Sequence, residues 1–535
     1  MRRPGPLVLL SIASLAALVP PERPDRQLLA KPAAGPPTPS IVLIVGDDVP
    51  LALLGPYGAP SFLTPNLNAL ASAPGASAMT AAFTPASICT PSRVALLTGR
   101  YPSKLAKKEH TEKEHAEKGP IEVGFNCCDP PIQDTSATLH RVLRSAGYYT
   151  AFMGKFHMAS PPFQALPEPN RRSPLLRACA QLDVSDFQVN DTCASAAVAS
   201  AVGADEAAAI WWDNVNSLKS RPFHDPERLA ELGREFVARS RGAGKRFFLH
   251  TNPTLTHEPL GPEMMAAMRE KQGDMLSKVE AGLATFIPRS AAQIAAWPDH
   301  FALGGRFAIT DQQLGRITGA NNEAGAVAWL DASLQPLLEE IGDDPDVLTV
   351  FTSDHGNVAT GKGTPYDGGA RVPLLLRWPR HAVAAANVWM RHIDWLPTLA
   401  ELAGQDPSGL AADGVSRAHA LWPTAVDPPA TGDDDAQLRL FLENGKSRGV
   451  RTTHWKLMVA PELGDDCDAL ASYTFGSADA VRDVHPAFCS AVQLYDLRSD
   501  PQEQNNLANN ASYVSTLKWL GAHIKAHEGK MVSAR

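Results

Sequence analysis

At 535 residues, the chain is longer than one ordinary hydrophobic core supports, so we expect two domains, or one large and one small. Its composition, with 44% hydrophobic and 20% charged residues, is that of a soluble globular protein. The net charge of -8 gives no reason to expect nucleic acid or an acidic membrane as a partner. An anionic substrate would therefore have to be attracted by local positive charge or by a metal ion.

The N-terminus has the organisation of a signal peptide. Met1-Arg2-Arg3 precedes an apolar stretch from Leu7 to Val19 that is too short to cross a bilayer, and a proline-rich region follows. We predict a signal peptide over 1–22 and a leader over 23–38, with an N-terminal anchor or a disordered tail as the alternative. Since no later segment resembles a transmembrane helix, no integral membrane span is expected.

The first predicted strand ends in two adjacent carboxylates. Residues 41–45 read Ile-Val-Leu-Ile-Val, the pattern of a fully buried parallel strand, and Gly46, Asp47 and Asp48 follow. Open α/β sheets place their sites at the carboxyl ends of such strands. Like charges this close are costly unless a cation lies between them, so the pair is compatible with a metal site. Taken alone, however, such a pair more often forms a solvated turn.

The stretch Ser-Ile-Cys-Thr-Pro-Ser-Arg at 87–93, with Leu-Thr-Gly-Arg at 97–100, is the most informative part of the chain. Pro91 suits the first turn of a helix that begins near Cys89. Taken alone, the stretch also fits a buried cysteine before a helix, with Arg93 in solvent. Its weight comes from the charged residues that follow other predicted strands.

Two further strands lead to basic residues. A helix over 136–147 precedes a short strand at 149–153 and then Lys155 and His157, which alternation places on the same side of an extended chain. A helix over 228–241 precedes a strand over 245–250, after which a loop carries His257. We interpret 104–118 as a solvated insertion, while 161–216 shows no regular pattern.

The last predicted strand of this region runs into a second pair of metal-type side chains. A long amphipathic helix over 321–341, which Pro336 should break near Leu334, precedes the strand that begins at Val347. That strand leads to Asp354 and His355, and Lys362 follows in a loop. A helix over 393–404 ends the region.

After Gly404 the composition shifts to Pro, Asp and Gly, which predicts a linker over 405–435. Short strands at 438–443, 449–451, 455–459 and 493–497 and a terminal helix over 513–528 predict a small α+β domain. We therefore divide the rest of the chain into a catalytic domain over 39–404, the linker and a C-terminal subdomain over 436–535.

In this order, the motifs resemble those of the type I sulfatases of the alkaline phosphatase superfamily, over nearly the whole chain from Ile41. The resemblance implies an α/β fold, with a large mixed, mostly parallel sheet flanked by helices and a smaller C-terminal α+β domain that carries an antiparallel sheet. Two details depart from the common pattern. Pro50 stands where Gly often follows the Asp pair, and Phe156-His157-Met158-Ala159 replaces Trp-His-Leu-Gly.

The resemblance also implies a chemistry. In this family a formylglycine-generating enzyme oxidises the cysteine, here Cys89, to a formylglycine whose hydrated aldehyde attacks the sulfur of a sulfate ester. Arg93 would hold the diol, and Lys155 and Lys362 the sulfate oxygens. His257 or Lys362 would protonate the departing alcohol. His157 would then take the proton of the second hydroxyl, so that the covalent sulfate leaves.

The implied metal ligands are Asp47, Asp48, Asp354, His355 and the oxidised Cys89. Three carboxylates form a hard donor set that suits Ca²⁺, with Mg²⁺ as the alternative. The nitrogen of His355 is an imperfect ligand for calcium, and many relatives have Asn at this position.

Two other functions remain as alternatives: a phospho- or phosphonate monoester hydrolase on the same fold, and a catalytically silent glycan-binding homologue. The silent homologue should have lost one or more of the charged residues, and none is lost. The expected substrate is a small-molecule or glycan sulfate ester, whose leaving group the sequence does not define. The expected location is the secretory pathway, extracellular or lysosomal, or the periplasm of a bacterium.

Six cysteines besides Cys89 fit an exported protein and allow three disulfides in 15 connectivities. Cys179–Cys193 and Cys467–Cys489 are plausible local pairs, whereas Cys127 and Cys128 must pair with each other or elsewhere. Two sequons, at Asn190 and Asn510, predict glycosylation if the chain enters a eukaryotic secretory route.

Overall fold

The computed structural model describes residues 38–105, 123, 136–158, 191–214, 224–257, 321–357, 361–381, 386–422, 439–460, 467 and 484–533. Several predicted features lie outside these residues. They are the signal peptide, the leader to residue 37, the solvated insertion beyond Leu105, the sequon asparagine Asn190, and Cys127, Cys128 and Cys179. The predictions for these residues stay predictions.

A seven-stranded sheet forms the centre of the larger part of the molecule. Its order is β2 (Ala76–Met79), β8 (Leu374–Arg377), β7 (Val347–Ser353), β1 (Ser40–Gly46), β6 (Phe247–Asn252), β4 (Tyr149–Lys155) and β5 (Glu206–Trp211). The five strands from β7 to β5 are parallel, and β8 is antiparallel to both β7 and β2. The predicted mixed, mostly parallel sheet is therefore confirmed.

Strand β1 shows why helices cover both faces of this sheet. Its five central residues are completely or almost completely buried, and successive side chains point to opposite faces. Ile41, Leu43 and Val45 belong to one hydrophobic core, and Val42 and Ile44 belong to another. A continuous apolar run thus supplies two cores at once.

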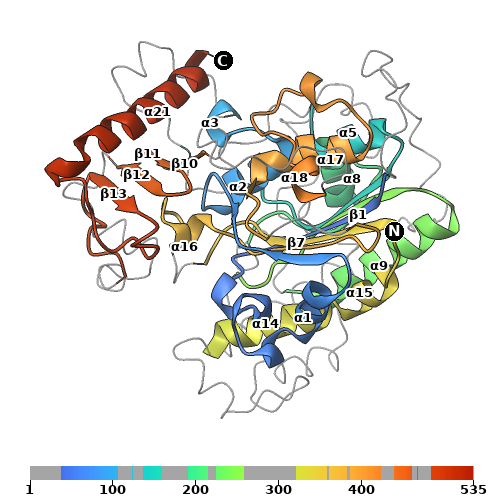
Figure 1. Cartoon of the computed structure of the whole chain (residues 1–535). Coiled ribbons are helices and arrows are strands. Elements are labelled where there is room, and N and C mark those ends of the chain that lie inside the picture. The colour runs from blue at the N-terminus through green and yellow to red at the C-terminus, as the bar shows by residue number, and fades with distance from the viewer. Residues whose placement is uncertain are drawn as a thin grey trace, which may run out of the picture.

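Helices line each core, as Figure 1 shows. The first is covered by α2 (Cys89–Thr98), α5 (Leu139–Ser145), α8 (Asp191–Val202), α17 (Trp395–Leu402) and α18 (Ala418–Leu421). The second is covered by α1 (Pro65–Ser72), α9 (Pro226–Gly242), α14 (Asn321–Ser333) and α15 (Gln335–Ile341). Short elements complete this part: α3 (Pro102–Leu105), α16 (Asp367–Ala370), and the parallel pair β3 (Ala82–Phe83) and β9 (Met390–Arg391).

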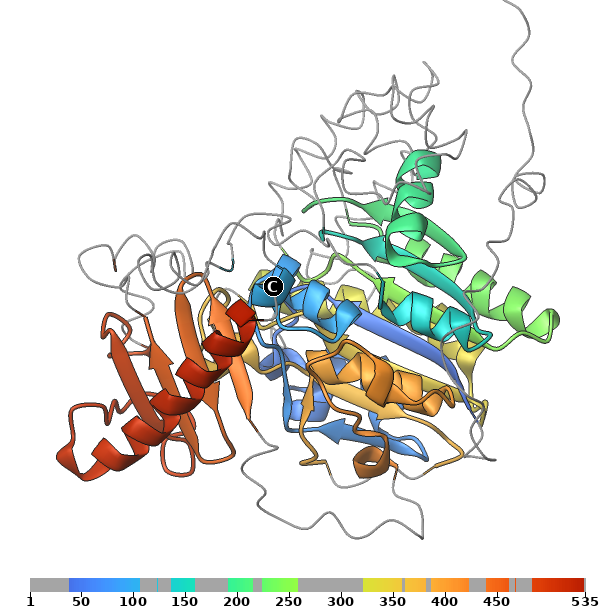
Figure 2. The same cartoon turned by 90° about the horizontal axis from the view of Figure 1, so that it is seen from above.

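The C-terminal part is a separate antiparallel sheet covered by one long helix. This part of the molecule lies beside the main sheet in Figure 2. The strands are β10 (Leu440–Asn444), β11 (Ser447–Arg451), β12 (Trp455–Val459) and β13 (Val492–Asp496), and the helix is α21 (Val514–Ser533). Leu520 and Ile524 of α21 pack on Val450, Leu457 and Leu494 of the sheet. This arrangement confirms the predicted α+β fold.

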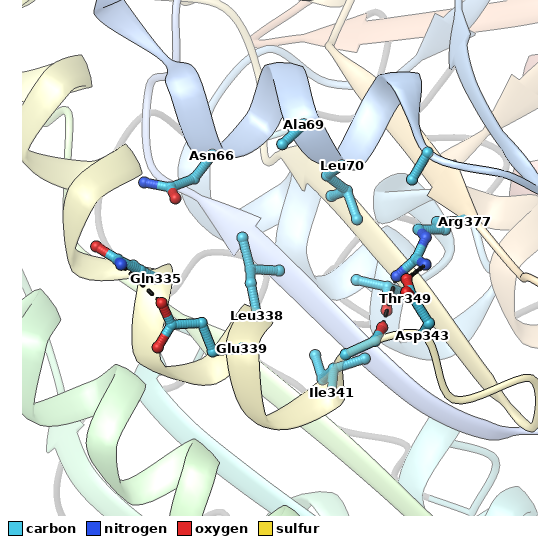
Figure 3. Close-up of a pocket in the computed structure, with 12 residues that line it drawn as sticks. Asn66, Ala69, Leu70, Gln335, Leu338, Glu339, Ile341, Asp343, Thr349 and Arg377 are labelled. Carbon is cyan, nitrogen blue, oxygen red and sulfur yellow. Dashed lines mark hydrogen bonds and ion pairs between the residues drawn. The ribbon is translucent and has the colours of Figure 1, made fainter.

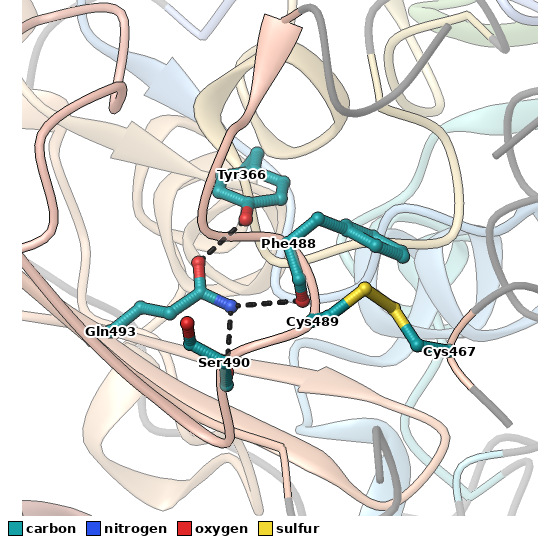
Figure 4. The surroundings of a disulfide bond; sticks show 6 residues. All are labelled: Tyr366, Cys467, Phe488, Cys489, Ser490 and Gln493. Carbon is teal, nitrogen blue, oxygen red and sulfur yellow. Dashed lines mark hydrogen bonds between the residues drawn. A yellow bond between two sulfur atoms is a disulfide. The ribbon is translucent and has the colours of Figure 1, made fainter. Parts of the chain in front are cut away.

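The predicted Cys467–Cys489 disulfide is present in this C-terminal part (Figure 4). Gln493 lies next to it and donates hydrogen bonds to the carbonyl oxygens of Phe488 and Ser490. Cys193 is also disulfide-bonded. The predicted pairing of Cys193 with Cys179 stays a prediction, because Cys179 lies outside the described residues.

Two local predictions have opposite outcomes. The expected break near Leu334 is confirmed, because α14 ends at Ser333 and α15 begins at Gln335, with Pro336 in its first turn. The interpretation of 161–216 as irregular was wrong for 191–211, where α8 and β5 lie. The sequence of α8 is rich in Ala, Ser and Val around its whole circumference, so it has no periodic apolar face to detect.

The predicted linker is described only as far as Trp422. Within that stretch, α18 packs on α17, and Leu421 and Trp422 contribute to the first core. The domain boundaries given above stay predictions. Among the helices of the described residues, none combines the length and apolar character that crossing a membrane requires.

Candidate active site

The charged residues identified in the sequence gather at one edge of the main sheet. Strands β7, β1, β6 and β4 are consecutive and parallel, so their carboxyl ends meet at that edge. Each strand delivers at least one of these residues within five positions of its end: Asp47 and Asp48 after β1, Asp354 and His355 after β7, Lys155 and His157 at β4, and His257 after β6.

Backbone hydrogen bonds fix the two acidic turns against each other. The amides of Asp48 and His355 both donate to Oδ1 of Asp354, at 3.1 and 2.9 Å. The amide of Val49 donates to Oγ of Ser353 at 2.9 Å. The turns after β1 and β7 therefore form one unit, in which the side chains of Asp48, Asp354 and His355 converge.

Cys89 begins helix α2 and is 3% exposed. Its Sγ lies 3.3 Å from Nε2 of His355 and 3.6 Å from Nζ of Lys155. The partial positive charge of the helix N-terminus also faces this position. Burial alone would raise the pKa of the Cys89 thiol, but Lys155, Lys362 and His355 hold that pKa well below its ordinary value.

The loop before Cys89 is attached to the loop that carries Lys362. Oγ of Ser87 donates to the carbonyl oxygen of Thr364 at 2.6 Å, and the amide of Gly363 donates to the carbonyl oxygen of Ser87 at 2.8 Å. Nδ2 of Asn444, at the end of β10, donates to Oγ of Ser87 at 2.9 Å. The C-terminal sheet thus supports the segment that positions Cys89.

Arg93 projects from the second turn of α2 into the same site. Its Nη2 lies 2.9 Å from Oδ1 of Asp47 and 2.9 Å from Oδ2 of Asp354, and its Nη1 donates to Oδ1 of Asn252 at 3.1 Å. Burial alone would lower the pKa of this guanidinium, but the two carboxylates raise it above its ordinary value. Arg93 is therefore a fixed positive charge between the turns after β1 and β7, not the solvated residue considered as an alternative.

Two lysines complete the set of cations. Nζ of Lys155, a completely buried side chain, lies 2.9 and 2.7 Å from the two carboxylate oxygens of Asp47. Nζ of Lys362 lies 2.9 and 2.6 Å from those of Asp48. Three cations thus face three carboxylates, so these six side chains together carry no excess charge that would attract an anion.

Two histidines stand at the rim of this group. Nε2 of His257 is 4.0 Å from Oδ2 of Asp48. His157 adopts a left-handed backbone conformation (φ 45°), and its carbonyl oxygen accepts a hydrogen bond from Oγ1 of Thr90, the residue after Cys89. Both histidines therefore lie in contact with the residues around Cys89.

One cluster in the described part of the chain has the donor atoms for a metal ion. Donor atoms of Asp48, Cys89, Asp354 and His355 all lie within 4.8 Å of one another, and all four residues are buried. Burial alone would lower the pKa of His355, but Asp354, Cys89 and Asp48 raise it to about 9. The cluster therefore attracts positive charge, which fits a cation bound by two carboxylates and an imidazole. Asp47, predicted as a further ligand, lies outside this cluster and pairs with Arg93 and Lys155.

A separate pocket has no connection with these residues (Figure 3). It lies between α1 and α15, and residues such as Asn66, Leu338 and Arg377 line it. Arg377 ends β8 and pairs with Thr349, near the start of β7. Asp354 follows the opposite end of β7, so the pocket and the charged residues lie at different ends of this strand. None of the predicted site residues lines this pocket.

Three polar residues of the site were missed in the sequence. Asn252 at the end of β6 holds Arg93, Asp213 contacts His157, and Asn214 contacts Lys155. Asn252 ends β6 and comes two residues after the strand predicted over 245–250, a position that was a usable signal. Asp213 and Asn214 follow β5, which lay in the region interpreted as irregular.

Comparisons with known proteins show which proteins the chain is similar to. The family model described as Sulfatase matches residues 39–405. Arylsulfatase A of Homo sapiens is 28% identical, over 88% of this chain and 83% of that protein. Steryl-sulfatase of Mus musculus is 28% identical, over 99% of this chain and 88% of that protein. The crystal structure of Ps i-CgsB in complex with k-i-k-neocarrahexaose has the same fold, with a TM-score of 0.54, 20% identity, and coverage of 92% of this chain and 93% of that chain.

Proposed function

The chain belongs to the sulfatase family, and on this premise we propose that it hydrolyses a sulfate ester to an alcohol and inorganic sulfate through a formylglycine made from Cys89. One observation carries the proposal. Cys89 begins a buried helix at the point where Arg93, Lys155 and the Asp48–Asp354–His355 cluster meet. These are the positions that the family's motifs assign to the nucleophile, the anion-binding cations and the metal ligands.

The family implies a divalent metal ion, which Asp48, Asp354, His355 and the oxidised residue 89 would hold, with Asp47 as a further ligand. Ca²⁺ suits the carboxylates best, and Mg²⁺ is the alternative. When bound, the ion supplies Lewis acidity to the sulfate oxygens and to the formylglycine hydrate. It also changes the charge balance, because the three cations and three carboxylates of the chain cancel one another. A bound divalent ion leaves the site positive, which favours the sulfate anion.

The remaining steps of the proposed mechanism are carried out by side chains of the protein. Lys155 and Lys362 would each donate an N–H group to a sulfate oxygen, and Arg93 would hold the hydroxyl groups of residue 89. His257 or Lys362, both close to Asp48, would donate the proton to the departing alcohol. His157 would accept the proton of the second hydroxyl, so that sulfate leaves and the aldehyde returns. An unmodified thiol has no second hydroxyl and cannot complete this cycle.

The substrate that we propose is a small-molecule or glycan sulfate ester. One structural neighbour was crystallised with k-i-k-neocarrahexaose, and the relatives include a steryl-sulfatase and an arylsulfatase. We also propose an exported protein that is extracellular, lysosomal or periplasmic. The Cys467–Cys489 disulfide supports that location, because disulfides persist in oxidising compartments.

Turnover of three model esters tests the proposed function. The protein is produced in a host that installs formylglycine, and an aryl sulfate, an aryl phosphate and an aryl phosphonate are compared, with Cys89→Ala as the matched inactive control. We expect the sulfate ester to be hydrolysed with the largest kcat/KM and the Cys89→Ala variant to lose this activity. Preference for the phosphate or phosphonate ester would replace the proposal with a phospho- or phosphonate hydrolase. No turnover of any ester would favour a silent homologue.

A further inference from the structure

The turn that follows β5 contacts both basic residues at the end of β4. Oδ1 of Asp213 lies 3.1 Å from Nε2 of His157, and Oδ1 of Asn214 accepts a hydrogen bond from Nζ of Lys155 at 2.6 Å. Oδ1 of Asp213 also accepts a hydrogen bond from the amide of Asn214 at 2.7 Å. Two adjacent residues of one turn therefore hold two residues that are themselves two positions apart.

A bulge in β5 brings the turn to this place. Along β4 and β5, Met153 pairs with Ala208 but Gly154 pairs with Ile210, so Ala209 is the extra residue, with a φ of 50°. The amide of Phe156 then donates to the carbonyl oxygen of Trp211 at 2.8 Å. Bulges of this kind re-aim the residues that follow them and are frequent beside active sites. Without the extra residue, alternation would place the side chain of Asp213 on the other face of the strand.

Packing makes the turn rigid on its inner side. Trp211 is completely buried, and Trp212 is 5% exposed, with its ring centroid 5.1 Å from that of Phe156. Phe156 lies between Lys155 and His157 in the sequence. The same aromatic contact therefore fixes the turn and the segment that carries both basic residues.

We propose that Asp213 and Asn214 are positioning residues, which hold His157 and Lys155 in the orientations that sulfate ester hydrolysis requires. The proposal rests on the proposed function, in which His157 is the base of the second step and Lys155 binds a sulfate oxygen. A carboxylate next to Nε2 keeps the proton on that nitrogen, and Nδ1 then has a free electron pair to accept a proton. The same carboxylate stabilises the imidazolium that forms.

Asp213 should therefore act mainly on the release of sulfate. In that step the O–H bond of the second hydroxyl breaks and its proton moves to His157. Its electron pair forms the C=O bond, and the C–O bond to sulfate breaks with its electrons leaving on sulfate. If this step slows while the first does not, kcat and KM fall together and kcat/KM changes little. A merely structural loss of the turn would lower kcat/KM as well.

The kinetic test compares Asp213→Ala with Glu206→Ala as the matched control. Glu206 lies at the other end of β5, is also paired with a basic side chain, and has the same partial exposure, 27% against 26% for Asp213. For Asp213→Ala we expect kcat for an aryl sulfate to fall about 10- to 100-fold, by analogy with the loss seen when the orienting partner of a metal-ligating histidine is removed. We also expect a burst of released alcohol before the slow steady state. Asp213→Glu should recover part of kcat.

A second readout needs no turnover. In the protein that keeps Cys89 and holds no metal ion, an Nε2–H of His157 that is buried and faces the carboxylate of Asp213 at 3.1 Å should give a ring N–H signal by NMR that exchanges slowly with water, assigned with His157→Gln. The signal should persist in Glu206→Ala and disappear in Asp213→Ala. For Asn214→Ala we expect KM to rise, because Lys155 loses a partner.

The outcomes separate the two proposals. If the wild-type protein hydrolyses no sulfate ester, the proposed function is wrong. The NMR signal then still tests the contact between Asp213 and His157, because it needs no turnover. A wild-type protein that hydrolyses sulfate esters, with Asp213→Ala equal to Glu206→Ala in kcat, burst and NMR signal, overturns the positioning role alone.

Discussion

Lys456 connects the two parts of the molecule through a buried ion network. Its Nζ lies 2.6 Å from Oδ1 of Asp367 and 2.6 Å from Oε1 of Glu503, and its side chain is completely buried. Asp367 begins α16, five residues after Lys362, whereas Lys456 lies on β12 of the C-terminal sheet. The network therefore holds the C-terminal sheet against the segment that follows Lys362.

Replacing Lys456 with Met should be strongly destabilising. The new side chain keeps most of the volume but leaves two buried carboxylates without their shared cation, and breaking a buried pair in this way costs about 3–5 kcal/mol. Arg451 keeps its pair with Asp367, with its Nε 2.9 Å from Oδ1. Glu503 loses its cation, so most of the cost should fall on Glu503. Lys456→Met/Glu503→Gln should therefore recover a substantial part of the lost stability.

The loss should also depend on pH. Burial raises the pKa of Glu503 to about 7, above its ordinary value of 4.5, although Lys456 counteracts that rise. The folded state thus binds more protons than the unfolded state between these values, and stability falls as pH increases through that window. Without Lys456 the pKa rises further and the window extends to higher pH. Lys456→Met should therefore lose more stability at pH 8 than at pH 5.

Urea unfolding followed by tryptophan fluorescence measures this effect. The midpoint and the m value are compared at pH 5 and pH 8 for the wild type, Lys456→Met, the double variant and Lys525→Met. Lys525 is an exposed lysine of α21 in the same sheet–helix unit and serves as the control. If Lys456→Met lowers the midpoint no more than Lys525→Met at pH 8, the network does not contribute as argued.

Two further predictions concern stability. Burial lowers the pKa of His140 to about 3, below its ordinary value of 6.5, so stability present above pH 6.5 is lost as pH falls toward 3. The phenyl ring of His140→Phe should keep the ring contacts with Phe152 and Phe248. Between pH 7 and pH 5 this variant should lose about 2 kcal/mol less unfolding free energy than the wild type, because it has no imidazole to protonate. If urea unfolding shows the same loss for both proteins, the prediction is wrong. Replacing both Cys467 and Cys489 with Ala opens a loop with a sequence separation of 22 and should cost about 3 kcal/mol of unfolding free energy. Wild type and variant should become equal under full reduction, and a difference that persists there would show that the loss is not due to the disulfide.

Much of the candidate site was predictable because chemistry and topology coincide at strand ends. The apolar run 41–45 predicts a buried parallel strand from its side chains alone, and the carboxylates that follow must then lie at the carboxyl edge of the sheet. The same reasoning brought Lys155 and Asp354 to that edge. The carboxyl ends of these strands meet if the strands are parallel neighbours in one sheet, and the structure confirms that they are.

The remaining features depend on contacts that no local pattern reveals. Strand β5 reads Glu-Ala-Ala-Ala-Ile-Trp, in which alanine has little preference for strands, and its bulge shifts the alternation. Asp213 and Asn214 were missed for that reason. The network of Lys456 with Asp367 joins residues 89 positions apart, and its specificity comes from how the C-terminal sheet docks. Such pairing is a property of the packed fold.

The state of residue 89 is the most direct test of the central claim. Protein from a host that installs formylglycine is digested with trypsin, and the mass of the peptide that ends at Arg93 is measured together with turnover of an aryl sulfate. We expect that peptide to have lost the sulfur of Cys89 and gained an aldehyde, and we expect activity to follow the converted fraction. A fully retained thiol in a preparation that hydrolyses sulfate esters would contradict the account.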